Sequence, residues 1–200
     1  GLPRLIFVSD MGDAFSRKQD FEFLRSEMAA FQTSEGQRQL WLWLTKRPDV
    51  MRQFVDSIGD FPANVCAMTT VTSAKTLSRV DALRGVNAAV RGLSQEPLWE
   101  PLADKIDLTG IDWVIVGGES GARANVELFP VEWAIELRDR CREEGVAFFL
   151  KQLGRRPSLQ GKEFKLRHPH GGDWSEWTRG LRVREMPEYF YSYAQQIAQA

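Results

Sequence analysis

The chain lacks several features that would assign it to a specialised class of protein. Only two of its 200 residues are cysteines, so no disulfide framework is expected. Only two are histidines, and they form no close-spaced ligand cluster with the cysteines, so the residues alone predict no metal site. No apolar run is long enough to span a membrane, and no signal peptide opens the sequence. These absences predict a protein of the reducing cytoplasm with no membrane partner.

A large excess of either charge is also missing. The 26 Lys and Arg residues nearly balance the 27 Asp and Glu residues, which gives a formal net charge of −1. The total therefore indicates neither a strongly basic nucleic-acid-binding protein nor an acidic tail, although a local basic cleft is compatible with it. Hydrophobic residues make up 43% of the chain, which suffices for one domain with a real core.

Short apolar runs alternate with segments of helical periodicity along most of the chain. The run from 40 to 44 is apolar at every position, which is typical of a strand buried on both faces of a parallel sheet. Helices are predicted at 20–31, after Pro48, after an N-cap at Ser73, and from about 130 to a C-terminal glycine at Gly145. Six strands are predicted, at residues 4–8, 40–44, 65–68, 88–93 (the weakest), 113–116 and 146–150.

This order predicts an α/β fold with about six parallel strand–helix units and right-handed crossovers. A full barrel of eight units usually needs roughly 250 residues, so we expect a partial (βα) barrel, with a doubly wound sheet as the alternative. The barrel is assigned to residues 1–154. Residues 155–200 are polar and glycine-rich until a short aromatic helix near Tyr189, and they are interpreted as a C-terminal tail that packs on the barrel.

Polar side chains follow every predicted strand. The carboxyl ends of parallel strands meet at one rim, where ligands bind in such folds, so we expect these side chains to share a site. The alternative is ordinary helix capping and solvation of loops. The candidate residues are Ser9, Asp10, Asp13, Lys46, Arg47, Glu96, Gly117, Gly118, Glu119, Ser120, Lys151 and Gln152.

Three of these candidates are assigned to catalysis. Glu96 and Glu119 can accept hydrogen bonds from a ligand, and Lys151 follows a very apolar strand that would lower its pKa. The alternatives are a carboxylate at a helix N-terminus for Glu96 and a lysine that reaches solvent for Lys151. The other candidates are assigned to ligand binding. The basic pair at 46–47 would hold a phosphate or carboxylate, and the glycine pair at 117–118 would let the backbone approach a ligand.

Cysteine and tryptophan positions indicate structural roles. Cys66 lies inside an apolar strand and Cys141 lies on the apolar stripe of a helix, so both are predicted to be small core residues. Trp174 and Trp177 lie in the tail. They could stack on nucleic-acid bases, but we favour the interpretation that they attach the tail to the barrel.

Several strings, taken together, resemble a phage and bacterial protein family of unassigned function. Its fuller members open with a three-cysteine motif like that of radical SAM enzymes. The strings occur in order over nearly the whole chain. They are FVSDMGDAF at 7–15, LTKRP at 44–48, LSQEPL at 93–98, DWVIVGGESG at 112–121, LKQ at 150–152 and the tail string at 171–187, which contains LRVR.

The resemblance implies a radical-SAM-like barrel, in which three cysteines hold an iron–sulfur cluster that binds S-adenosylmethionine. This chain has no three-cysteine loop, which would lie upstream of Gly1, and residues 70–73 also depart from the family pattern. No cofactor is therefore expected in this chain alone. The sequence leaves three interpretations: part of a radical-SAM-like enzyme, a module that binds nucleic acid or a nucleotide at the same rim, and a subunit whose first strand pairs with a partner chain that completes the barrel.

Overall fold

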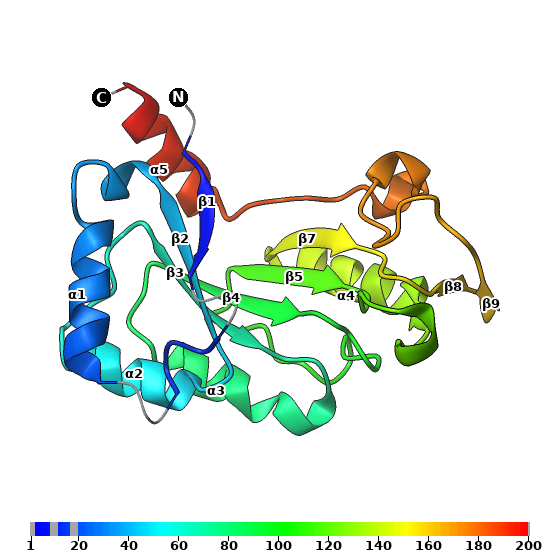
Figure 1. The fold of residues 1–200 in the computed structure, drawn as a ribbon, viewed down its shortest axis with the longest axis horizontal. Helices are drawn as coiled ribbons and strands as arrows, with labels where there is room; N and C mark the ends of the chain where they lie inside the picture. The colour runs from blue at the N-terminus through cyan, green and yellow to red at the C-terminus, as the bar shows by residue number, and fades with distance from the viewer. Residues whose placement is uncertain (1–2, 9–11, 17–19, 200) are drawn as a thin grey trace.

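The computed structural model describes residues 3–8, 12–16 and 20–199, and it contains a curled sheet of six parallel strands. Each strand pairs with the next one in the order β1-β2-β3-β4-β5-β7, and the sheet forms a half-barrel (Figure 1). The α/β partial barrel predicted from the sequence is confirmed. The strands are β1 (Leu5–Val8), β2 (Leu40–Thr45), β3 (Val65–Thr70), β4 (Val90–Gln95), β5 (Trp113–Gly117) and β7 (Ala147–Gln152).

Four helices cover the outer, convex face of the sheet, and local signals in the sequence place their ends. They are α1 (Phe21–Phe31), α2 (Pro48–Asp56), α3 (Ser78–Arg84) and α4 (Val131–Glu144). The Asp20 side chain accepts a hydrogen bond from the backbone N–H of Glu22 and caps α1. Gly145 adopts a left-handed conformation with φ of 70° and ends α4, as predicted. The helices and the sheet enclose the main core, with Trp43 and Phe54 fully buried in it.

One predicted detail of the helices, the N-cap at Ser73, is wrong, and one crossover of the sheet contains no helix. Residues 96–112, which connect β4 to β5, contain no helix, because Pro97 and Pro101 interrupt the segment. Buried Leu98, Leu102 and Ile106 of this loop fill the place of a helix in the outer core. Ser73 caps the short 3-10 helix η2 (Ala74–Thr76) rather than α3, which begins four residues later. The sheet therefore has six strands but fewer than six strand–helix units.

A fifth helix, α5 (Glu188–Gln199), covers the inner, concave face at the amino ends of the strands (Figure 1). Phe190 is fully buried, and its ring meets the Trp113 ring edge-on at a centroid distance of 6.5 Å. The Tyr193 hydroxyl donates a hydrogen bond of 3.0 Å to the carbonyl oxygen of Gln37, which lies just before β2. Apolar packing and this hydrogen bond thus hold α5 against the amino ends of the strands.

The tail contacts the barrel along β7. The backbone N–H of Leu150 donates to the carbonyl of Val183, and the N–H of Glu185 donates to the carbonyl of Phe148, each at 2.9 Å. These bonds cover the edge of β7, whereas β1 pairs only with β2 among the described residues. Trp177 is buried in the main core, and its indole N–H donates to the Gly171 carbonyl.

A small second sheet of three strands has no counterpart among the predicted elements. It consists of β6 (Phe129–Pro130), β8 (Pro157–Leu159) and β9 (Lys162–Glu163). Within the described parts of the chain, none of the helices combines the length and the apolarity that crossing a membrane requires.

Replacing Phe190 with alanine tests whether α5 is an integral part of the fold. Loss of this fully buried ring should lower the free energy of unfolding by about 3 kcal/mol, measured by urea denaturation. Tyr191→Ala on the same helix is the control, because its side chain is 47% exposed and its loss should change stability by about 0.5 kcal/mol or less. Equal effects of the two substitutions would contradict the packing described for α5.

Candidate functional site

The carboxyl ends of the strands surround a cavity of about 590 Å³, which we call the rim cavity. Seven of the twelve candidate residues line it: Lys46, Glu96, Gly118, Glu119, Ser120, Lys151 and Gln152. The lining is completed by five residues that were not among the candidates: Phe7, Leu44, Thr70, Ser94 and Pro97. Period-2 alternation along the strands could have found Leu44, Thr70 and Ser94, since each is the last residue of its strand on the concave face.

An ion pair between a largely buried carboxylate and a half-exposed lysine lies in the wall of the rim cavity. The Lys151 ammonium is 3.1 Å from Oε2 of Glu96, whose side chain is only 14% exposed. The other oxygen, Oε1, is buried and has no hydrogen-bond partner among the described residues. Burial raises the pKa of Glu96 above its ordinary value, and the neighbouring Lys151 offsets only part of this effect. Glu96 therefore holds its proton more strongly than an exposed glutamate does.

The ion pair spans β5, which lies between the two strands that carry it. A Cβ atom on Gly117 would be only 2.7 Å from Oε1 of Glu96, so the glycine provides the space for this carboxylate. Val116 pairs with Leu150 and Gly117 pairs with Gln152, which makes Lys151 the extra residue of a β-bulge. A bulge redirects side chains, and as a result the consecutive residues Lys151 and Gln152 both line the cavity.

Lys151 also connects the two edges of the curled sheet. Its ammonium lies 5.6 Å from the centroid of the Phe7 ring on β1, within the range of a cation–π interaction. The Phe7 side chain remains 39% exposed at the cavity mouth. The curl of the sheet therefore brings its first and last strands together over the concave face.

The glycine and glutamate at 118–119 form another side of the cavity. A Cβ atom on Gly118 would be 2.5 Å from the carbonyl oxygen of Leu153, so the missing side chain makes room for the protein's own backbone. The Glu119 carboxylate accepts a 3.1 Å hydrogen bond from the backbone N–H of Glu127, and its carbonyl accepts one from the N–H of Arg155. The half-buried Glu119 is thus held in place with one carboxylate oxygen bonded.

Among the described candidates, Asp13, Arg47 and Gly117 do not line the cavity. Asp13 accepts hydrogen bonds from the Thr45 hydroxyl, from the Lys46 backbone N–H and from the Arg47 guanidinium. Burial raises the pKa of Asp13, but these bonds outweigh it and keep the pKa below its ordinary value. The Asp13–Arg47 pair therefore holds the end of β2. Of the basic pair at 46–47, Lys46 lines the cavity and Arg47 does not. Ser9 and Asp10 lie outside the described residues.

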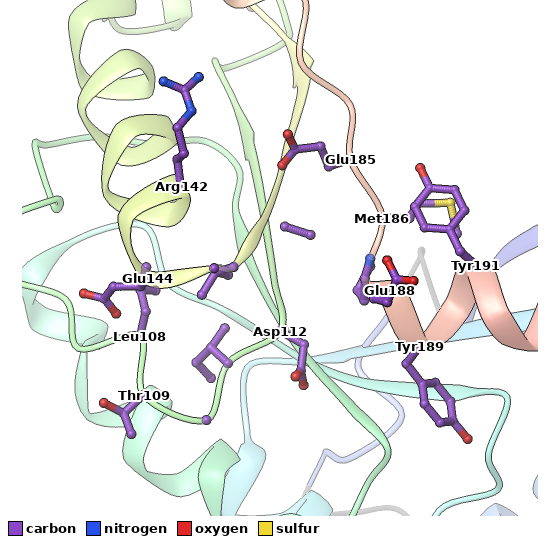
Figure 2. A pocket seen from close by; sticks show the side chains of 16 residues that line it. Leu108, Thr109, Asp112, Arg142, Glu144, Glu185, Met186, Glu188, Tyr189 and Tyr191 are labelled. Atoms are coloured by element: carbon purple, nitrogen blue, oxygen red, sulfur yellow. The ribbon is translucent and has the colours of Figure 1, made fainter.

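A larger hollow of about 760 Å³ lies at the opposite end of β5 and β7. Figure 2 shows the last turn of α4 on one side of it and the segment from Glu185 to Tyr191 on the other. Four carboxylates and a single arginine line it: Asp112, Glu144, Glu185, Glu188 and Arg142. Two of the carboxylates have backbone partners, since Asp112 accepts from the N–H of Arg91 and Glu185 from that of Phe148. None of the sequence candidates lies here.

A family model matches residues 2–178 of the chain, nearly its whole length. The description of that family is "Protein of unknown function (DUF5131)". The chain belongs to the DUF5131 family. Neither a curated protein nor a solved structure matches it. The match carries no information about a three-cysteine motif or a phage source, so the radical-SAM resemblance stays a prediction for this DUF5131 chain.

The described residues do not fit an iron–sulfur cluster. They contain no group of three or more His, Cys, Asp or Glu side chains placed to hold a metal ion. Cys66 packs beside Trp113 and Phe190 on the concave face of the sheet, and Cys141 packs in the main core. Both are fully buried. Both are therefore core residues, as the sequence predicted. Burial raises the pKa of both thiols, that of Cys141 to about 12.

Replacing Lys151 with methionine tests the electrostatics of the ion pair. The pKa of Glu96 should rise further, because burial remains while the ammonium that favours the carboxylate is lost. Carbon-13 NMR titration of the glutamate carboxyl groups measures the change, with Glu96→Gln to assign the resonance. Lys162→Met, which removes an exposed charge on β9, is the control. An unchanged Glu96 pKa in Lys151→Met would contradict the pairing.

The raised pKa also predicts how stability depends on pH. The folded state binds the Glu96 proton more tightly than the unfolded state, whose carboxyl titrates near 4.5. The stabilisation from this proton is complete below that value and is lost as the pH rises through the folded-state pKa. Glu96→Gln should remove this component from the pH profile of the unfolding free energy.

Proposed function

We propose that the rim cavity binds a nucleotide-like or other anionic small molecule. The observation that carries the proposal is the convergence of six polar candidates from the ends of four strands on one cavity of about 590 Å³. That volume lies within the usual range for small-ligand sites, and the carboxyl ends of parallel strands are where such sites form. Lys46 and Lys151 would contact the anionic group, and Glu119, Ser120 and Gln152 would bind its polar atoms.

Glu96 is the residue that we assign to acid–base chemistry in this cavity. A carboxyl group with a raised pKa can carry a proton closer to neutral pH, and its unpartnered Oε1 could donate that proton to a ligand. Lys151 would assist this proton transfer, because its ammonium stabilises the carboxylate that remains when Glu96 loses its proton. Glu119 is assigned to positioning the ligand, since its carboxylate is already fixed by the Glu127 N–H.

The radical-SAM resemblance suggests one member of this ligand class. S-adenosylmethionine is a nucleoside that carries both an ammonium and a carboxylate, and two lysines and two glutamates line the cavity. The described residues supply no cluster ligands, so we derive no reaction step from a cluster. What we propose for this chain is binding of the nucleoside ligand.

Binding measurements with Lys46→Ala test the proposed site. The wild-type chain should bind adenosine monophosphate or S-adenosylmethionine in isothermal titration calorimetry. Lys46→Ala should weaken that binding about tenfold, the loss of one charge-assisted hydrogen bond. Lys162→Ala is the matched control, because this lysine is exposed on β9 and does not line the cavity. Absence of binding to both probes would count against the rim cavity as a nucleotide site.

The open edge of β1 favours a second candidate function, the pairing of this strand with a partner chain. Segment 183–185 covers the edge of β7, but no described residue pairs with the outer edge of β1. The apolar side chains of Leu5 and Phe7 are 40% and 39% exposed there. Uncovered strand edges with apolar side chains are sites of strand addition. We propose a second copy of this chain as the simplest partner.

Sedimentation velocity over a wide range of protein concentrations tests this pairing. The wild-type chain should self-associate, and Leu5→Lys should abolish the association, because an inserted charge blocks edge pairing. Phe23→Lys on α1 is the control, since it replaces an apolar side chain that is 51% exposed, against 40% for Leu5, and that lies away from the edge. A wild-type chain that remains monomeric at every concentration would refute the pairing with a second copy.

A further inference from the structure

The tail concentrates positive charge that the whole chain does not show. Residues 155–184 contain eight Lys and Arg residues but only three Asp and Glu residues, whereas the full chain has a net charge of −1. Part of this charge surrounds a cavity of about 230 Å³, which we call the tail pocket. Its lining residues are Arg123, Gly154, Arg155, Lys165, Leu166, His168 and Pro169.

Among the described residues, the polar side chains that line the tail pocket are two arginines, a lysine and a histidine, and no carboxylate lines it. Arg155 is held in place, since its backbone N–H donates to the Glu119 carbonyl and its guanidinium to the Pro169 carbonyl at 3.1 Å. Lys165 is exposed, and its ammonium makes no hydrogen bond or ion pair with any other described residue. The pocket thus combines a fixed guanidinium with a free ammonium.

The carboxylate of Glu163 neutralises only part of the arginine charge beside the pocket. Glu163 lies outside the lining and forms ion pairs with both Arg123 and Arg156, the latter at 3.3 Å. One carboxylate is therefore shared between two guanidinium groups. With Arg155 and Lys165 included, the surroundings of the pocket keep a clear positive excess.

The hydrogen bonds of His168 give the pocket a further donor. Its Nδ1 accepts hydrogen bonds from the backbone N–H groups of His170 at 3.2 Å and Gly172 at 3.1 Å. Two donors at Nδ1 select the neutral tautomer with the proton on Nε2, which leaves Nε2–H free to donate. The Glu176 carboxylate accepts from the backbone N–H groups of Arg167 and His168 and orders this loop.

We propose that the tail pocket binds a phosphate group of a single-stranded nucleic acid. A guanidinium fork, an ammonium and an imidazole N–H around a small cavity form the donor set that phosphate oxygens require. The excess of arginine and lysine continues through residues 155–184. Arg167 pairs with Glu176 at 3.1 Å but keeps an 88% exposed side chain, so the surface favours a chain of phosphates over one. The proposal does not depend on what the rim cavity binds.

Fluorescence anisotropy with a labelled oligouridylate tests the proposal on the full chain. Lys165→Ala should weaken binding about tenfold, and the slope of log affinity against log salt concentration should fall by about 0.7, the value for one phosphate contact on a single strand. This lysine has no described partner, so its removal should leave folding intact, which circular dichroism checks. Lys162→Ala removes the same charge from β9, outside the pocket, and should leave the affinity within about twofold of the wild type.

Four outcomes would overturn the proposal. Absence of oligouridylate binding would do so, as would an equal loss in Lys162→Ala and Lys165→Ala, which would indicate diffuse surface attraction. Competition by inorganic phosphate or adenosine monophosphate at the affinity of the oligonucleotide would reject a nucleic-acid strand as the source of the phosphate. Binding to phosphatidylserine vesicles with the same dependence on Lys165, and no oligonucleotide binding, would assign the pocket to a membrane surface instead.

Discussion

The rim cavity depends on the absence of a side chain at Gly117. Glu96 directly follows β4 and Lys151 lies on β7, and these strands are not neighbours. A Cβ atom at position 117, on the strand between them, would collide with the Glu96 carboxylate. The β-bulge at Lys151 then turns its side chain toward the same point. With Phe7 beneath the ammonium, one lysine connects β1, β4 and β7 across the concave face. Gly117 thus allows a site that alternation along ideal strands would not form.

The two ends of the half-barrel differ in what fills them. At the amino end, the fully buried Phe190 of α5 packs on Trp113, beside the hollow of about 760 Å³ at the start of β5 and β7. At the carboxyl end, Thr70, Ser94 and Glu96 point into an open cavity instead. A buried carboxylate with an unpartnered oxygen destabilises a fold, and nothing in the packing of this end requires one. Such a group is retained where a ligand completes its hydrogen bonds, which is why the carboxyl end is the better candidate for a site.

The sequence predicted the sheet well because each strand is a short, nearly continuous apolar run, and consecutive parallel strands leave few alternative orders. It also predicted which loops meet, since this follows from strand direction alone. It could not predict which polar residues face the cavity. Asp13 and Arg47 are candidates of the same kind as Glu96 and Lys151, yet they bind each other at the end of β2. That choice depends on contacts between residues distant in the sequence, which neither periodicity nor composition encodes.

Most of the short elements of the tail escaped prediction for a related reason, whereas its aromatic helix near Tyr189 was predicted. These short elements are stabilised by contacts with the barrel, such as the buried Trp177 and the edge bonds at 183–185, rather than by local periodicity. The hydrogen bond between the Arg155 N–H and the Glu119 carbonyl joins the wall of the tail pocket to the wall of the rim cavity. Both cavities lie within the range 2–178 matched by the family model, whereas α5 lies beyond it. A shared activity of DUF5131 proteins is therefore better sought in these two cavities than at the end covered by α5.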